Sequence, residues 1–143
     1  AAPARPAPAP TAARVTRAPL DSAAADSLYV GDEPDAAARA YEDVLALAPD
    51  DARATFRLAR LRGRGDPEGA RALHRRYVAL VPDDAWGWLA LAQAHARVGA
   101  LDDALAAADR AARLAPDASD VALDRARLLE RAGRDDAAIV AFE

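Results

Sequence analysis

The chain has 143 residues, 52% of them hydrophobic and 29% charged, which is the size and composition of one globular domain. It has no cysteine, so a disulfide framework and a thiolate metal site are excluded. Alanine supplies 43 residues and aromatic side chains only 5%, a composition that favours closely packed helices. The net charge is -4, and the three arginines of residues 1–19 leave -7 on the rest, so we expect no nucleic-acid partner.

The first segment, residues 1–19, is rich in alanine and proline and has almost no large apolar side chain. Because such a segment cannot form a packed core, we expect a disordered, extended linker. A proline-rich docking motif is the alternative interpretation. The segment is too polar for the core of a signal peptide, and we expect no transmembrane segment in the chain.

Helical patterns follow from residue 20. Leu20–Val30 predicts a weak first helix, and Pro34 suits the first turn of a second helix that ends before Pro49. The pattern is clearest from Ala85 to Pro116, where two helices are separated by glycine at residue 99. One face of the first carries Trp88, Leu91, Ala92 and His95, and one face of the second carries Ala104, Ala108, Ala111 and Leu114.

The same spacing recurs along the chain. Glycines at 31, 65, 99 and 133 lie 34 residues apart, and an alanine follows each of them five residues later. Prolines at 49, 82 and 116 close three of the units. This pattern resembles the tetratricopeptide repeat (TPR) family.

The resemblance implies an all-α fold, a right-handed TPR-like solenoid of antiparallel helix pairs. We expect it to span residues 20–143. Its units are predicted at about 20–49, 50–82, 83–116 and 117–143, the last of them truncated.

The second unit departs from the pattern, because Arg57 stands where the family usually buries leucine. Two interpretations stay open. The helix is shifted by one residue, so that Leu58-Ala59 takes the buried place of Leu91-Ala92, or the arginine is paired and half-exposed. Arg125 occupies the equivalent place in the fourth unit, where the same question arises.

Several polar groups are candidates for chemistry, and each has a structural interpretation that we favour. Paired aspartates at 50–51, 83–84, 102–103 and 135–136 precede helices, so we interpret them as helix caps and not as a cation site. His74 and His95 fall where the family packs aromatic rings, so we expect packed histidines. Arg64-Gly65-Asp66 reads as a turn with a helix cap. We therefore expect no catalytic residue, no metal and no cofactor.

In TPR arrays the first helix of each pair lines the concave face, through family positions 2, 5, 9, 12 and 13. We number these from Asp51, Ala85 and Ser119 in the last three units. The candidate peptide-binding residues are then Thr55, Arg62, Trp86, Leu89, Gln93, Arg97, Leu123, Arg127 and Arg131.

Trp86 is the most informative of these, because Trp88 already fills the core position of the family. Tryptophan and arginine are typical of binding hot spots, and together they suit a peptide with acidic groups. The alternative is that Trp86 covers a neighbouring helix and the arginines pair with nearby acids. The carboxylate clamp of the chaperone-binding TPRs uses lysine and asparagine where this chain has Leu89 and Gln93, which argues against chaperone tails.

The predicted function is a non-enzymatic scaffold that binds a peptide or protein segment in the concave groove. An architectural spacer or accessory subunit of a larger bacterial envelope or secreted assembly is the alternative. A nucleic-acid-binding helical repeat is disfavoured by the negative charge. The compartment stays open, with a lean to the bacterial periplasm or envelope over the cytoplasm.

Overall fold

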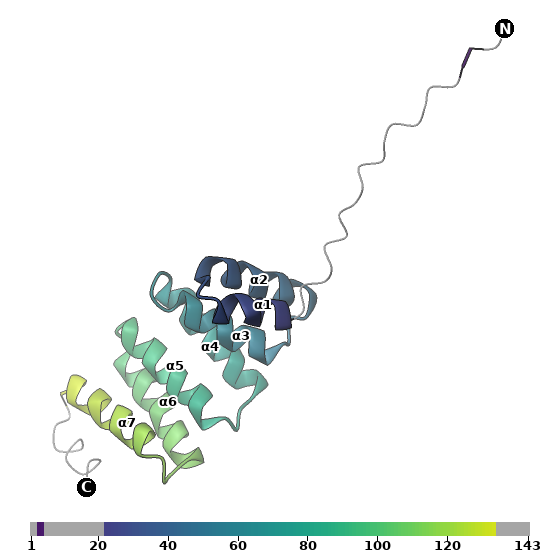
Figure 1. Cartoon of the computed structure of the whole chain (residues 1–143). Coiled ribbons are helices and arrows are strands. Elements are labelled where there is room, and N and C mark those ends of the chain that lie inside the picture. The colour runs from purple at the N-terminus through teal and green to yellow at the C-terminus, as the bar shows by residue number, and fades with distance from the viewer. Residues whose placement is uncertain (1–2, 5–21, 134–143) are drawn as a thin grey trace.

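The computed structural model describes residues 3–4 and 22–133, and the regular structure of this part is entirely helical. The helices follow one another as a layered array (Figure 1). Their bounds are α1 Ser22–Val30, α2 Pro34–Leu47, α3 Ala52–Arg62, α4 Pro67–Leu80, α5 Ala85–Arg97, α6 Leu101–Leu114 and α7 Ser119–Arg131.

Each helix packs mainly on the helix before it and the helix after it, and α5 also touches α7. This one-dimensional pattern of contacts defines a solenoid, in which each unit covers the apolar side of its neighbour. The predicted all-α solenoid is confirmed. The predictions for residues 1–19 lie outside the described residues except at positions 3 and 4, and the second helix of the fourth unit lies outside them altogether.

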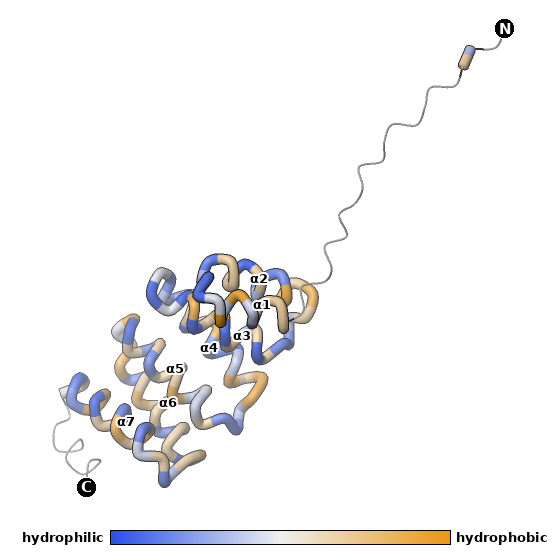
Figure 2. The backbone as a smooth tube through the Cα atoms, in the orientation of Figure 1, coloured by the Kyte–Doolittle hydropathy of each residue, from blue (hydrophilic) through white to orange (hydrophobic). Residues whose placement is uncertain are grey.

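The buried surface is made largely from alanine. The helices carry both hydrophobic and hydrophilic stretches in Figure 2, as amphipathic helices do. Small side chains let helix axes approach closely, so that the interior is filled without large aromatic residues. The alanines with no exposed surface are Ala25, Ala37, Ala54, Ala59, Ala92, Ala104, Ala108, Ala111 and Ala126.

Aspartates begin several of the helices. Asp51, Asp66 and Asp84 accept hydrogen bonds from first-turn backbone N–H groups of α3, α4 and α5, at 2.9, 2.9 and 3.0 Å. Asp102 and Asp103 lie within the first turn of α6, whose N-cap residue is Ala100 and makes no side-chain cap. The capping interpretation therefore holds for Asp51 and Asp84, whereas Asp102 and Asp103 lie in the first turn, where the helix dipole favours a negative charge. The pair at 135–136 lies outside the described residues.

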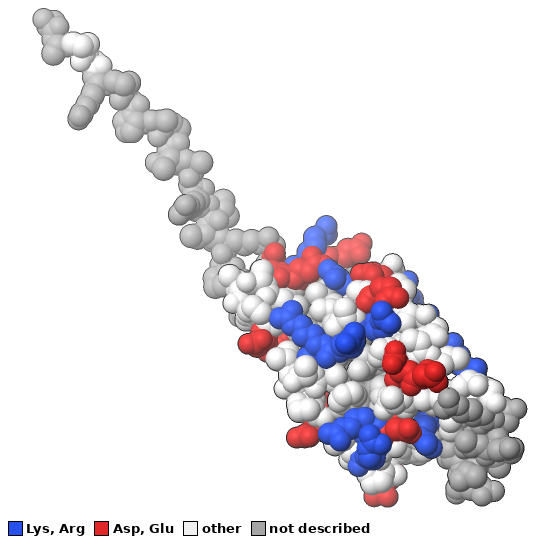
Figure 3. Space-filling view, turned by 180° about the vertical axis from the view of Figure 1, so that it is seen from behind, with Lys and Arg blue, Asp and Glu red and all other residues white. Residues whose placement is uncertain are grey.

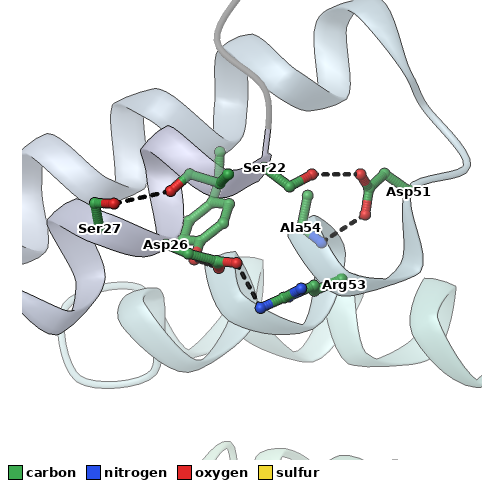
Figure 4. A network of polar contacts seen from close by, with 8 residues as sticks. Ser22, Asp26, Ser27, Asp51, Arg53 and Ala54 are labelled. Atoms are coloured by element: carbon green, nitrogen blue, oxygen red, sulfur yellow. Dashed lines mark hydrogen bonds and ion pairs between the residues drawn. The ribbon is translucent and has the colours of Figure 1, made fainter.

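The first unit is tied to the second by polar contacts, which Figure 4 shows from close by. Ser22 Oγ donates to Asp51 at 2.8 Å, and Arg53 forms an ion pair with Asp26 at 2.6 Å. The Tyr41 hydroxyl donates to Asp26 at 2.5 Å. Burial and this hydrogen bond raise the pKa of Tyr41 well above its ordinary value. These contacts join α1 to α2 and α3, and they compensate for the short first helix.

Both interpretations of the displaced arginines are realised, one in each unit. In the second unit the register is shifted, since Leu58-Ala59 is buried and the Arg57 guanidinium lies 4.6 Å from the centre of the Tyr29 ring. In the fourth unit Arg125 is paired and half-exposed, with its Nε 2.5 Å from Asp109. Each arginine thereby keeps its charge solvated or paired.

Gly87 lets a tyrosine pack against α5. The Tyr77 hydroxyl donates to Asp84 at 2.6 Å, and its ring lies 4.8 Å from that of Phe56. A Cβ added at Gly87 would meet Tyr77 Cδ1 at 2.8 Å and Cε1 still closer. Burial and the Asp84 hydrogen bond raise the pKa of Tyr77 to about 12, so the ring is held as a neutral phenol.

Replacing Gly87 by alanine should destabilise the fold, although alanine is the better helix former. The overpacking against Tyr77 should lower the free energy of unfolding by about 1–3 kcal/mol, measured by urea denaturation. The same substitution in a Tyr77→Leu background should cost less, because the rigid ring is gone. Gly65→Ala is the control, since a Cβ there meets nothing within 4 Å. An equal cost in both backgrounds would contradict this account.

Candidate functional site

A cavity of about 610 Å³ lies along the first helices of the last three units. It is bordered by α3, α5 and α7, with α4 contributing to one end. A second cavity of about 270 Å³ adjoins it between α5 and α7. Of the predicted groove residues, Trp86, Leu89, Gln93, Arg97, Leu123 and Arg127 line the larger cavity, and Arg131 lines the smaller.

Two predicted groove residues lie elsewhere. The Thr55 side chain is fully buried, and its Oγ1 donates to the Asp51 carbonyl at 2.8 Å. Arg62 forms an ion pair with Glu42 of α2 at 2.5 Å and lines neither cavity. The prediction that Thr55 and Arg62 lie on the groove is therefore corrected.

The reason is a one-residue error of register in the second unit. Asp51 and Asp84 are equivalent caps, so α3 begins at Ala52 as α5 begins at Ala85. Thr55 then takes the core position that Trp88 holds in the next unit. The same shift brings Phe56, Arg60 and Arg64 to the cavity, and sequence reasoning missed all three. The 33-residue separation of the two capping aspartates was the signal that would have found them.

The apolar part of the groove is formed by α5 and α7. Trp86 is 51% exposed and Leu123 is 37% exposed, so both present ring or methyl surface to solvent. Leu89 is only 5% exposed and packs in one cluster with Ala111 and Val121. The predicted apolar patch thus has two accessible residues, Trp86 and Leu123, while Leu89 forms the floor beneath them.

Polar contacts connect neighbouring units along the groove. Gln93 Nε2 donates to Asp124 at 2.6 Å, and Arg127 lies 3.4 Å from the same carboxylate. Arg97 donates to the Gly63 carbonyl of the preceding unit at 3.3 Å, and Arg131 donates to an α5 carbonyl at 3.2 Å. The arginines of the last turns thus satisfy carbonyl groups at the end of the preceding first helix.

His74 of α4 lines the same cavity and is 6% exposed. Its ring packs edge-on against Phe56 at 5.5 Å, and its Nδ1 has no hydrogen-bond partner among the described residues. Burial, followed by the positive charges of Arg97 and Arg60, lowers the pKa of His74 to about 4. The packed-histidine prediction holds for His74 and also for His95, which is 8% exposed.

Two other features, a cluster of metal ligands and a membrane-spanning helix, are not found among the described residues. In residues 3–4 and 22–133 no three histidine, aspartate or glutamate side chains are grouped so that they could hold a metal ion. None of the helices described has the length and apolar character that crossing a membrane requires.

Two family models settle the family. Tetratricopeptide repeat models match residues 22–85 and 61–122, which together cover most of the chain. The chain belongs to the tetratricopeptide repeat family. Repeats of this family build scaffolds for protein–protein interaction, and this chain is such a scaffold.

Solved structures agree on the fold. A crystal structure of MamA superposes with a TM-score of 0.77 at 24% identity, covering 82% of this chain and 69% of that one. MamA from Desulfovibrio magneticus RS-1 superposes with a TM-score of 0.79 at 20% identity, covering 84% and 68%. A search of curated protein sequences gave no match. At these identities the likeness concerns the fold, and this chain spans about two thirds of the length of those structures.

The buried His74 should make stability depend on pH. Its pKa is about 6.5 unfolded and about 4 folded, so the unfolded chain binds the proton more readily between these values. Stability should therefore fall as the pH drops from about 6.5 to about 4, by up to ~3 kcal/mol from this group. His74→Phe keeps a ring and removes the titration. Urea denaturation at several pH values should show the variant losing less stability over this range, and parallel curves for the two proteins would refute the assignment.

Proposed function

We propose that this chain is a non-catalytic scaffold that binds a peptide or protein segment in the concave groove along α3, α5 and α7. The observation that carries the proposal is the pair Trp86 and Leu123, which expose apolar surface over a cavity of about 610 Å³. Exposed tryptophan next to arginine is typical of interface hot spots, because burying the large apolar ring against a partner stabilises the complex.

The shape and lining of the groove favour a chain segment over a reacting small molecule. The groove extends over three successive first helices and is open to solvent, which suits an extended or helical peptide. The described residues that line the larger cavity include no serine, threonine or cysteine nucleophile. Their one histidine is packed against Phe56 and is disfavoured as a cation, so it is poorly suited to general acid–base work.

The proposal predicts the effect of truncating the groove. Trp86→Ala and Arg97→Ala should each weaken partner binding at least about tenfold, because each removes a contact that the partner makes. The partner would be identified by affinity purification of the full-length protein with mass spectrometry, and its Kd measured by calorimetry. Circular dichroism should stay unchanged.

The matched control is Leu47→Ala, which removes an apolar side chain that is 72% exposed on α2, outside both cavities. It should leave the Kd unaltered. If the Trp86 and Arg97 variants bind the partner with unchanged affinity, the groove is not the binding site. The alternative function, an architectural spacer, would then be favoured.

A further inference from the structure

The charges along the groove are unevenly distributed. Arg60 and Arg64 reach the larger cavity from α3 and the turn after it, and Arg97 reaches it from the end of α5. The ion pairs of the described residues use other arginines, and no described carboxylate lies within ion-pair distance of these three. Among the described residues, these three arginines therefore have no carboxylate counter-ion. We call these three residues the arginine corner.

A second observation, the environment of His74, also shows positive charge without a nearby negative group at this end of the cavity. His74, buried beneath the arginine corner, has an Nδ1 atom without a partner. The charges that act on its imidazole come from Arg97 and Arg60, and both disfavour a further proton. The imidazole is therefore neutral, and the positive charge that acts on it would attract an anion to the corner.

The α7 side of the groove carries both signs of charge. Asp120 and Asp124 of α7 line the larger cavity together with Arg127. Gln93 and Arg127 already engage Asp124, so the aspartate belongs to the contacts between units. An acidic ligand group would be attracted more strongly to the arginine corner, where no described carboxylate offsets the positive charge.

We propose that the arginine corner binds carboxylates of an acidic partner segment, while a neighbouring apolar side chain of that segment packs on Trp86 and Leu123. The inference rests on the proposed function and adds the chemistry and the direction of the bound segment. Arginine suits this role, because its planar fork donates two parallel hydrogen bonds to one carboxylate. Acidic residues of the partner then lie over the ends of α3 and α5 that carry the arginine corner, and its apolar residue lies over Trp86 and Leu123.

An acidic peptide fits better than an extended polyanion such as a nucleic acid. The corner has three arginines, and Asp120 and Asp124 interrupt the positive charge on α7. The chain has a net charge of -4, and the face seen in Figure 3 carries basic and acidic groups side by side. Such a surface offers no long basic track for a phosphate backbone.

The test is a selection of random peptides displayed on phage, carried out in parallel on the wild-type chain and three variants. Wild type should select peptides in which aspartate or glutamate lies near leucine or an aromatic residue. Synthetic peptides made from these sequences should bind Arg60→Glu/Arg64→Glu at least about tenfold more weakly. That variant should itself select lysine or arginine in place of the acids, a gain that misfolding cannot produce.

The matched control is Arg39→Glu/Arg113→Glu, which changes the net charge equally on exposed arginines of α2 and α6 outside the cavities. It should select the wild-type peptides with unchanged affinity. Amidated and free-acid forms of each synthetic peptide distinguish a chain-terminal carboxylate from side-chain carboxylates, and sensitivity to either supports the corner. Binding should also weaken as salt is raised.

The outcomes separate the two proposals. If wild type selects apolar peptides without acids, and Trp86→Ala abolishes that selection, the arginine corner is overturned and the groove stands. If Trp86→Ala selects the same peptides as wild type, or wild type selects none, both are overturned. Equal affinity of the acidic peptides for wild type and Arg60→Glu/Arg64→Glu overturns the corner alone.

Discussion

The structure depends on close packing between alanine-rich helices that cannot hide their apolar sides alone. Fully buried alanines such as Ala59, Ala92 and Ala108 stand at these contacts. A methyl group fills little volume, so the helix axes must approach closely for the interior to be filled. Each unit therefore needs its neighbour, and the first helices are brought side by side as a consequence. The groove is therefore a consequence of this packing, because it lies along the first helices that the packing brings side by side.

The groove and the core share residues, so the floor of the groove is part of the packed interior. Leu89 packs with Ala111 and Val121 while it forms the floor under the exposed Trp86 and Leu123. A floor that belongs to the core cannot be rearranged without loosening the last two units. If a segment binds in this groove as we propose, the packed floor lowers the conformational entropy that is lost on binding.

The fold could be predicted because glycines and their following alanines recur every 34 residues and prolines close the units at spacings of 33 and 34. The site was harder, because a groove assignment depends on the register of each helix. Around Arg57 the sequence allows two registers, and the choice rests on where Tyr29 and the Asp51 cap lie in space. Arg60 and Arg64 were missed because the positions of the second unit were numbered from Asp51 and not from Ala52, although the 33-residue separation of Asp51 and Asp84 indicates the correct start. The burial of His74 beside them is a tertiary fact that no local pattern encodes.

The contacts of Arg97 and Arg131 with carbonyl groups of the preceding unit have a mechanical consequence. Beside the groove, neighbouring units are joined by these hydrogen bonds to backbone oxygen. In the interior they are joined by contacts between buried methyl groups. These contacts respond to different conditions, since water competes for the first while cooling weakens the second. The two kinds of contact that join neighbouring units therefore weaken under different conditions.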